Sequence, residues 1–407
     1  MNGWQTRALE EVCQFSNGLW KGEKPPFVNV GVLRNTNFTR EGTLDHSDIA
    51  YLDVEAKKLE KRRLQFGDII LEKSGGGPKQ PVGRVALFDK EDGDFSFSNF
   101  TAAIRVLDPN KLDFRFLHKF LHWTYLSGVT EGMQSHSTGI RNLDADAYKA
   151  LKIALPEAAE QRRIVAIVDE AFVAIATAKA NAEKNLQNAR ALFESYLHRV
   201  FVDPVDGWVE RTLGDVCQFE NGDRGKNYPN RDEYVDSGIP WINTGHIERD
   251  GTLSQDEMNF ISREKYESLR SGKIRPGDLV YCLRGATLGK TALVDPLTEG
   301  AVASSLVIVR PTEGLDRRFL YYFLTSPHGQ GLIKAYENGA AQPNLGARSV
   351  ARFKIPLPTL PEQRSIVGRL DGLAVETQRL ESVFQQKLTA LDALKRSLLH
   401  QAFTGQL

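Results

Sequence analysis

One stretch of the sequence limits the possible folds more than any other, because it predicts an unusually long helix. The segment from Glu157 to Phe201 contains neither Pro nor Gly. Apolar or alanine side chains recur along it in alternating steps of three and four residues, the heptad pattern of a helix that packs against another helix. At 1.5 Å per residue this helix would be roughly 60 Å long, longer than the core of one small domain requires. Its apolar side includes Ile164, Val168, Ile175, Leu186 and Phe193.

A second segment of the same kind ends the chain. Its apolar side includes Ile366, Leu370, Leu380, Leu391 and Leu398. Two helices with long apolar sides can cover each other, as they do in coiled coils. We therefore expect the two segments to pair as an antiparallel coiled coil that holds two other domains a fixed distance apart.

The sequence is one unit written twice. Matching segments are 3–4 with 207–208, 12–15 with 216–219, 152–156 with 354–358, and 160–162 with 362–364. Internal repetition of this kind indicates units of related fold. Two such units joined head to tail are expected to be arranged about a pseudo-two-fold axis.

Each repeat begins with a region that predicts a mixed domain dominated by strands. These regions are rich in Gly, Asn and Asp turn signals and in short β-branched or aromatic runs. The expected fold class is therefore α+β, with two repeated strand-rich globular domains separated by two long antiparallel coiled-coil helices. The expected boundaries are 1–156 for the N-terminal domain, 157–203 for the first long helix, 204–358 for the C-terminal domain, and 359–407 for the second long helix and tail.

Composition argues against several classes of protein. Lys plus Arg and Asp plus Glu both number 52, so the formal net charge is zero. This balance counts against unselective binding to a polyanion but not against a local basic surface. The cysteines Cys13, Cys217 and Cys282 are too scattered for a disulfide framework or a zinc site, and we expect the first two to be buried. Because no long apolar run and no secretory signal pattern occur, we expect a cytoplasmic protein.

The motifs that could indicate catalysis have simpler explanations. The segment 285–291 (GATLGKT) is similar to a phosphate-binding loop, but that motif needs four residues between its glycines and here there are three. Gly67-Asp68 before a β-rich run could belong to a metal site, yet a turn with Gly at positive φ explains the pair better. The His residues show no metal-ligand spacing, and no adenine methyltransferase motif is present. We therefore expect no metal site and no catalysis by this chain alone.

The helices, the junctions before them and the repeat together resemble the specificity subunits of type I restriction-modification systems. The most specific elements are the junctions KIALPEAAEQRRIV and KIPLPTLPEQRSIV, the Gly-Trp starts and the terminal AFTGQL. The resemblance covers essentially the whole chain. It implies two target-recognition domains, each reading one half of a split, asymmetric double-stranded DNA sequence, with the helices setting the gap between the halves.

The resemblance also implies partners and cofactors. Two methylation subunits would dock on the helices, and restriction subunits with motor and nuclease activity would join them. S-adenosylmethionine, and ATP with Mg for restriction, would be used by those partners, and no cofactor is expected in this chain. The chain would thus choose the DNA site in a prokaryotic cytoplasm while its partners carry out the chemistry.

Three kinds of loop are candidates for contact with DNA in each repeat: a Gly-rich basic loop, a polar segment after a strand-like run, and a polar segment before the junction. Arg, Asn, Gln and Thr side chains match base edges, and basic side chains reach phosphates. The candidate DNA-binding residues are Arg34, Asn35, Asn37, Lys73, Lys79, Gln80, Arg84, Arg141, Asn142, Asn243, Thr244, His246, Arg284, Lys290, Gln342 and Asn344. For each, the alternative is a solvated turn residue or a loop side chain that hydrogen bonds to nearby backbone.

Two functions follow from these patterns. The first is a DNA sequence-specificity subunit with a two-part target. The alternative is a non-catalytic coiled-coil scaffold for protein interactions without a DNA role. The basic loops and base-matching side chains favour the first, and a salt-dependent DNA affinity would exclude the second.

Overall fold

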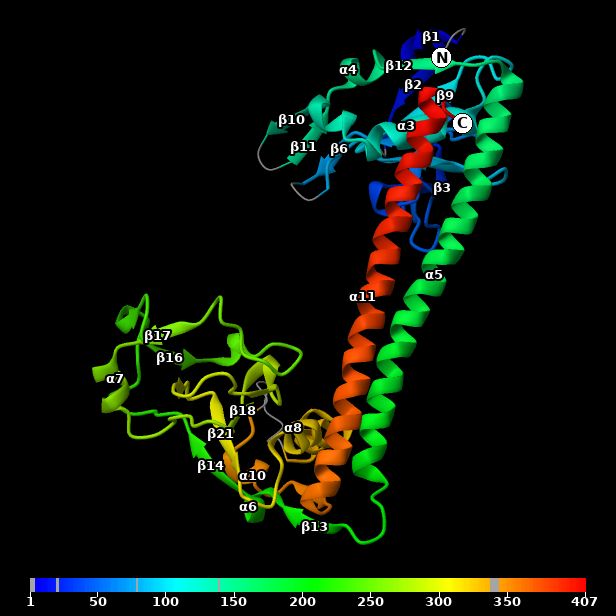
Figure 1. The fold of residues 1–407 in the computed structure, drawn as a ribbon. Coiled ribbons are helices and arrows are strands. Elements are labelled where there is room, and N and C mark those ends of the chain that lie inside the picture. Colours follow the sequence, from blue (N-terminus) through cyan, green and yellow to red (C-terminus); the bar gives the residue numbers. More distant parts are fainter. Residues whose placement is uncertain (1–3, 20–21, 78–79, 138–139, 337–343) are drawn as a thin grey trace. The chain divides into compact units, whose positions relative to one another are not determined.

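The computed structural model describes residues 4–19, 22–77, 80–137, 140–336 and 344–407 (Figure 1). The chain divides into two compact units: Met1–Glu183 with Gln386–Leu407, called unit 1, and Lys184–Gln385, called unit 2. The long helix α5 (Ala158–Val202) begins in unit 1 and ends in unit 2. The long helix α11 (Leu360–Thr404) begins in unit 2 and ends in unit 1.

The globular parts of the two units share most of their elements in the same order. In unit 1 they are β1 (Gln5–Ala8), α1 (Leu9–Val12), β2 (Cys13–Asn17), β3 (Phe27–Leu33), η1 (Asn35–Asn37), β4 (Ala50–Glu55), α2 (Ala56–Glu60), β5 (Ile69–Glu72), β6 (Ser74–Gly76), β7 (Val85–Leu87), β8 (Phe95–Phe97), β9 (Thr101–Val106), α3 (Phe114–Leu126), η2 (Val129–Met133), β10 (Gln134–Ser137), β11 (Ile140–Leu143), α4 (Ala145–Lys149) and β12 (Lys152–Leu155). In unit 2 they are β13 (Val209–Thr212), α6 (Leu213–Val216), β14 (Cys217–Asn221), η3 (Arg231–Glu233), β15 (Tyr234–Val235), β16 (Ile239–Ile242), η4 (Thr244–His246), β17 (Asn259–Ile261), α7 (Arg263–Ser268), β18 (Leu279–Cys282), η5 (Gly285–Thr287), β19 (Thr291–Leu293), β20 (Ala301–Val302), β21 (Leu306–Pro311), α8 (Arg317–Thr325), α9 (Pro327–Tyr336), α10 (Ala347–Val350) and β22 (Lys354–Leu357). Among the described residues, the sheet of β6, β10 and β11 occurs only in unit 1, and β15 and α9 occur only in unit 2.

Each unit is organised around a four-stranded antiparallel sheet. The strand order is β2-β9-β5-β7 in unit 1 and β14-β21-β18-β19 in unit 2. A second sheet, β4-β3-β8 or β15-β17-β16-β20, contains one parallel pair in each unit, β3 with β8 and β16 with β20. A two-stranded ribbon, β1-β12 or β13-β22, leads into the long helix. The expected α+β class, with two strand-rich domains and two long helices, is confirmed.

The helix that follows the four-stranded sheet, α3 or α8, connects that sheet to the long helices. Its first turn is capped by an aspartate: Asp113 accepts hydrogen bonds from two backbone amides of α3, and Asp316 does the same for α8. The apolar side of α3 packs in one core with strands β5 and β9, the start of α5 and the end of α11. The apolar side of α8 packs with β18, β21, the end of α5 and the start of α11. Each globular part is thereby joined to both long helices through one hydrophobic core.

Within each unit the two long helices run antiparallel (Figure 1). In unit 1, Lys179 of α5 pairs with Asp392 of α11 at 2.8 Å. In unit 2, Arg190 of α5 pairs with Glu381 of α11 at 2.8 Å. Exposed ion pairs of this kind add little stability, so the apolar contacts hold the helices together.

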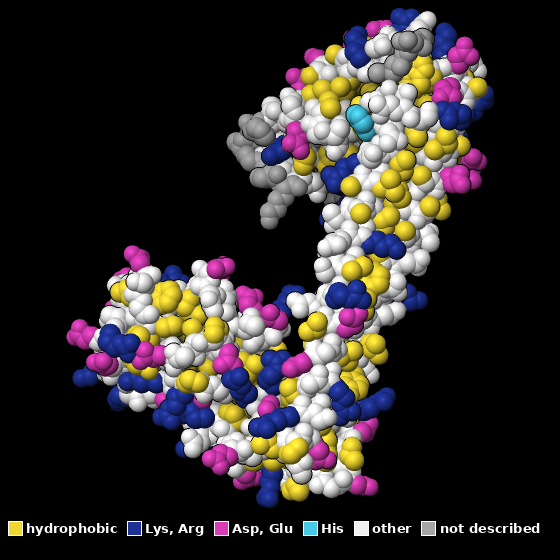
Figure 2. Space-filling view, in the orientation of Figure 1, with side chains coloured by type: hydrophobic (Ala, Val, Ile, Leu, Met, Phe, Trp, Pro, Cys, Tyr) yellow, Lys and Arg dark blue, Asp and Glu magenta, His cyan; other side chains and the backbone are white. Residues whose placement is uncertain are grey.

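The apolar side predicted for the two helices varies in its degree of burial. Its buried members are Ile164, Val168, Ile175, Ile366 and Leu370, and its half-buried members are Leu186, Phe193, Leu380, Leu391 and Leu398. At the end of α11 the fully buried leucine is Leu399, because the last turns of this helix also face α3. Other apolar side chains remain exposed along both helices (Figure 2), among them Val173, Leu192, Val375 and Leu394.

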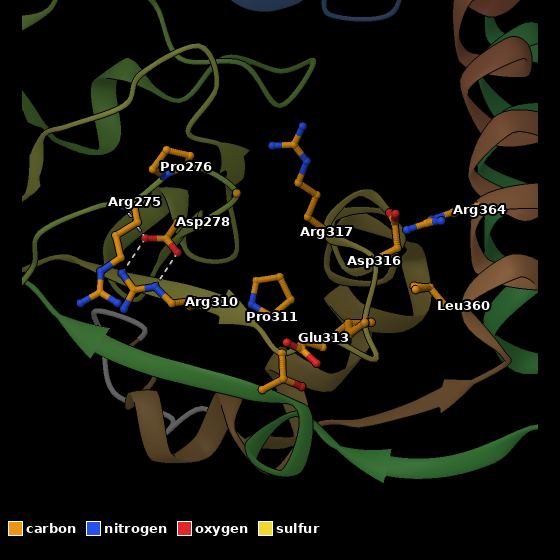
Figure 3. Close-up of a pocket in the computed structure, with 13 residues that line it drawn as sticks. Arg275, Pro276, Asp278, Arg310, Pro311, Glu313, Asp316, Arg317, Leu360 and Arg364 are labelled. Atoms are coloured by element: carbon orange, nitrogen blue, oxygen red, sulfur yellow. Dashed lines mark hydrogen bonds and ion pairs between the residues drawn. The ribbon is translucent and has the colours of Figure 1, made fainter.

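The Gly-Asp pairs before β5 and β18 form turns, as predicted. Gly67 and Gly277 both have φ of +89°, a conformation that favours glycine. The buried carboxylate of Asp278 accepts the backbone N–H of Arg275 and two hydrogen bonds from the Arg310 guanidinium, at 2.8 and 2.7 Å (Figure 3). The Asp68 carboxylate is held in the same way by Arg105 in unit 1. The pairs are structural, and a metal ion is not needed to explain these acids.

Two of the cysteines were predicted to be buried. Cys13 and Cys217 lie at equivalent positions in the cores of the two units, and burial raises the pKa of each thiol to about 12. Their predicted burial is confirmed. Throughout the described part of the chain, none of the helices has the length and apolar character needed to cross a membrane.

Candidate nucleic-acid interface

The first candidate segment is a short 3₁₀ turn, η1 in unit 1 and η4 in unit 2. The last residue of each turn folds back on its start: Asn37 Oδ1 accepts the backbone N–H of Arg34 at 2.9 Å, and His246 Nδ1 accepts that of Asn243 at 3.1 Å. Asn37 is only 1% exposed and His246 only 3%. Burial also lowers the pKa of His246, which favours the neutral ring that can accept this bond. Both side chains stabilise the turn from its buried side, so neither is available at the surface to contact DNA.

The second candidate segment is the loop after β5 or β18, and its basic residue is tied to the 3₁₀ turn. Arg84 Nη1 donates to the carbonyl oxygen of Phe38 at 3.4 Å, and Lys290 Nζ donates to that of Ile247 at 3.3 Å. Phe38 and Ile247 are the residues that end η1 and η4. Each basic side chain therefore makes one equivalent bond to the residue that ends the 3₁₀ turn of its unit.

Arg84 is further occupied by a buried acid. Its guanidinium donates to both carboxylate oxygens of Glu72, at 2.8 and 2.9 Å, and to the backbone oxygen of Asn35 at 3.0 Å. Glu72 is 1% exposed, and it also accepts from the Asn35 amide at 3.2 Å. With its amide turned so that the oxygen faces Arg84, Gln80 adds an acceptor at 2.8 Å. Glu72 was not among the candidate residues, because its partner Arg84 lies 12 residues further along the chain, beyond the loop, and no local pattern links the two.

The third candidate segment lies just before the junction and meets the second one. In unit 1, Ser74 is paired with Asn142 between β6 and β11, and Ser74 Oγ donates to Asn142 Oδ1 at 2.6 Å. In unit 2, Arg284 and Asn344 form the equivalent bridge. The structure thus brings together two segments that are far apart in the sequence. Lys79 and Gln342 lie outside the described residues.

Several candidates keep polar groups at the surface around these three segments. In unit 2, Arg284, Lys290 and Asn344 are exposed, and Asn243 and Thr244 are half-buried. In unit 1, Arg34, Asn35, Lys73, Arg141 and Asn142 are half-buried and Gln80 is exposed. Lys73 Nζ donates to Asn17 Oδ1 at 2.8 Å, and burial lowers the pKa of Lys73. Asn17 was not among the candidate residues, although the pair Asn17-Gly18 recurs in the second repeat as Asn221-Gly222.

The side chains of this surface are suited to hydrogen bonding. Amide, hydroxyl and guanidinium groups can bond to base edges, and ammonium groups can contact phosphates. Among the described residues, no three His, Cys, Asp or Glu side chains lie close enough together to hold a metal ion. A cavity of about 410 Å³ in unit 2, lined by Arg275, Arg310, Arg317 and Arg364, lies at the other end of β18 and is separate from this surface (Figure 3).

These features define a duplicated recognition protein, in which one scaffold presents two equivalent polar surfaces with different side chains. The profile of the family described as type I restriction modification DNA specificity domain matches residues 1–186 and 205–390, and the chain belongs to that family. It is therefore the DNA specificity subunit of a type I restriction-modification complex, a component of the enzyme that is not itself catalytic.

A relative with the same description and two solved structures with the same fold are similar to this chain. The chain is 24% identical to the EcoKI type I restriction enzyme specificity subunit of Escherichia coli (strain K12), over 92% of this chain and 82% of that protein. A chain from a structural study of complex assembly and conformational transition of the type I R-M system matches with a TM-score of 0.81 and 22% identity, covering 100% of this chain and 99% of that one. The crystal structure of the HsdS subunit from Thermoanaerobacter tengcongensis matches with a TM-score of 0.65 and 21% identity, covering 100% and 98%. At these identities the two solved structures support the fold.

Proposed function

We propose that units 1 and 2 each read one half of a split, asymmetric double-stranded DNA target. The observation that carries this proposal is the equivalence of the two polar surfaces. Arg34 and Asn243 occupy the same place before the 3₁₀ turn, and Ser74 and Arg284 occupy the same place in the bridge to the third segment. Different side chains on one scaffold would hydrogen bond to different base edges, so the two half-sites differ.

The residues proposed to contact DNA are those that keep polar groups at the surface. They are Arg34, Asn35, Lys73, Gln80, Arg141, Asn142, Asn243, Thr244, Arg284, Lys290 and Asn344. Lys79 and Gln342 remain proposals from the sequence. Asn37, Arg84 and His246 instead support the loops, because their side chains are used inside the units. Arg284→Ala should weaken recognition of one half-site by about 1–3 kcal/mol if Arg284 bonds to a base.

The long helices are proposed to set the gap between the half-sites and to dock two methylation subunits. Exposed apolar residues occur at matched positions of the two helices, Val173 with Val375 and Leu192 with Leu394. Large apolar side chains that stay exposed at repeated positions favour a partner surface that is used twice. The methylation subunits would supply S-adenosylmethionine chemistry, and restriction subunits would supply ATP- and Mg-dependent cleavage.

The alternative is a scaffold in which the helices bind proteins and the loops have no DNA role. The equivalent surfaces with amide and guanidinium groups favour DNA recognition over this alternative. A measured affinity that falls steeply with salt would exclude the scaffold.

The test is to map methylated bases across the genome of cells that express this chain with its neighbouring methylation subunit. We expect one split, asymmetric motif with a fixed gap, absent when this chain is omitted. A complex that assembles but methylates no motif dependent on this chain would overturn the proposal and favour the scaffold.

A further inference from the structure

Two buried glutamines occupy the same place at the start of the two long helices. Gln161 of α5 and Gln363 of α11 are both 0% exposed. A glutamine amide offers two N–H donors and one oxygen acceptor, and a buried amide is stable only where these are used. Both side chains belong to the repeated Glu-Gln-Arg sequence that follows the junction.

Each glutamine makes the same three hydrogen bonds. In unit 1, Gln161 Oε1 accepts the backbone N–H of Asp113 at 2.8 Å, and its Nε2 donates to the carbonyl oxygens of Lys111 and Pro156, both at 2.8 Å. In unit 2, Gln363 Oε1 accepts the backbone N–H of Asp316 at 2.8 Å. Its Nε2 donates to Gly314 at 3.0 Å and to Pro358 at 2.9 Å.

These bonds connect the long helix to the helix of the globular part. Asp113, which is held by Gln161, is itself the residue that caps α3, with its carboxylate accepting from Arg115 at 2.7 Å. Asp316 plays the same double role for α8, and Figure 3 shows it at the start of α8 beside the first turns of α11, where Leu360 and Arg364 lie. The glutamine side chain thus ties the start of α3 or α8 to its long helix through hydrogen bonds to backbone groups.

A second connection lies about 12 Å further along each long helix, at 1.5 Å per residue. Lys119 of α3 pairs with Asp169 of α5 at 2.6 Å. In unit 2, Asp371 of α11 accepts from Arg318 and from the Tyr322 hydroxyl of α8, both at 2.5 Å. Together with the hydrophobic core, two polar connections along one helix restrict the rotation as well as the tilt of the globular part more than one connection would.

We propose that Gln161 and Gln363 are positioning residues that set the angle of each recognition domain on its long helix, and thereby the single gap length between half-sites. This inference rests on the proposed role of the long helices as the spacer. The amide suits the task because it is uncharged, so the connection does not weaken with salt as an exposed ion pair does. A glutamate in its place would lack both donors, and an apolar residue would leave three backbone groups of the joint without these bonds.

The test uses Gln161→Met and Gln363→Met, singly and together, in the complete complex with the methylation subunit. Gln187→Met and Gln378→Met are matched controls, because they change exposed glutamines of the same helices. Each complex methylates a plasmid library in which the two half-sites are separated by the native gap or by one base pair more or fewer. We expect the variants to raise methylation at the altered gaps by about tenfold relative to the native gap, as for loss of a buried hydrogen-bonded contact, while the half-site bases stay the same.

Other outcomes are equally informative. A variant that assembles, has a lower Tm and still uses only the native gap would overturn the positioning role and leave a purely structural one. If the methionine variants fail to assemble, Asp169→Ala and Asp371→Ala remove the more exposed second connection, and unchanged gap selection by these variants would overturn the proposal. A wild-type complex with no fixed gap would instead overturn the spacer role itself.

Discussion

At the scale of single residues, the two units differ in groups that titrate. His118 and His122 lie one turn apart on α3, buried and stacked with ring centroids 6.2 Å apart. The equivalent positions of α8 hold Tyr321 and Thr325, counted from the capping aspartates. Gly42 faces His118 as Gly251 faces Tyr321, which supports the match. Unit 1 therefore contains buried bases where unit 2 has none at the same place.

We expect unit 1 to lose stability in mild acid. Burial lowers the pKa of His118 to about 4, with Lys119 acting in the same direction, and burial lowers the pKa of His122 well below its usual value. The unfolded chain binds protons at these rings below about pH 6.5, while folded unit 1 resists them. Their contribution is thus present above pH 6.5 and is lost as the pH falls toward 4.

The measurement is thermal unfolding between pH 7.5 and 4.5 for the wild type and for a His118→Tyr, His122→Thr variant that copies unit 2. The variant should show a smaller fall in Tm over this range. The variant keeps the other charged residues near these positions, which are Glu41, Lys119, Asp169 and Lys395. A difference in the fall of Tm between the variant and the wild type therefore reports on the two histidines. An equally steep fall in the variant would rule out the histidines as the cause.

Arg84 and Arg284 form a second contrast between residues, since both were candidates for DNA contact. Arg84→Ala would leave Glu72 buried without its charged partner, which should cost about 3–5 kcal/mol of folding free energy. Arg284→Ala removes an exposed side chain and should change stability by less than about 0.5 kcal/mol. Denaturant unfolding of the two variants measures the difference. Adding Glu72→Gln to Arg84→Ala should restore much of the loss, and equal stabilities of the single variants would contradict the assigned role of Arg84.

At the scale of elements, the long helices, their junctions and the duplication could be predicted because their signals are local or periodic. A heptad pattern can be recognised from residues that are close together in the sequence. The junction before each long helix can be recognised because its sequence occurs twice. The hydrogen bonds and packing that hold the candidate DNA-binding loops in place could not be predicted in the same way. The partner of Arg84 is Glu72 at the end of β5, before the loop. The burial of Asn37 and His246 goes with the packing of the next residues, Phe38 and Ile247, in cores that contain strands of two sheets.

The pairing of the long helices gives a prediction at this scale. Leu391→Asp places a charge on the half-buried apolar side of α11, and should destabilise unit 1 by at least about 2 kcal/mol through lost packing and charge burial. Leu192→Asp, on an exposed part of α5, is the matched control and should leave the fold intact. Circular dichroism during thermal unfolding compares them. A Leu391→Asp chain as stable as the control would show that this side of the helix does not carry the packing.

At the scale of the whole molecule, duplication allows one chain to present each functional surface twice. The loops differ between the units, whereas two pairs of exposed apolar residues on the long helices match, Val173 with Val375 and Leu192 with Leu394. A surface that must accept the same partner twice has to repeat, and a surface that reads two different half-sites must not. Under the proposed function, the matching apolar residues would serve assembly and the differing loops would serve recognition.

This separation predicts the stoichiometry of partner-surface variants. Val173→Asp should weaken binding of one methylation subunit, and Val375→Asp the other, by about tenfold or more, because an aspartate in an apolar contact must lose its hydration. Native mass spectrometry of the assembled complex should show two methylation subunits with the wild type, mainly one with each single variant, and none with the double variant. Asn181→Asp adds the same charge at an exposed polar position of α5 and should leave two subunits bound. Full occupancy in both single variants would place the docking surface elsewhere on the chain, because a partner that depends on these valines cannot tolerate their replacement by a charge.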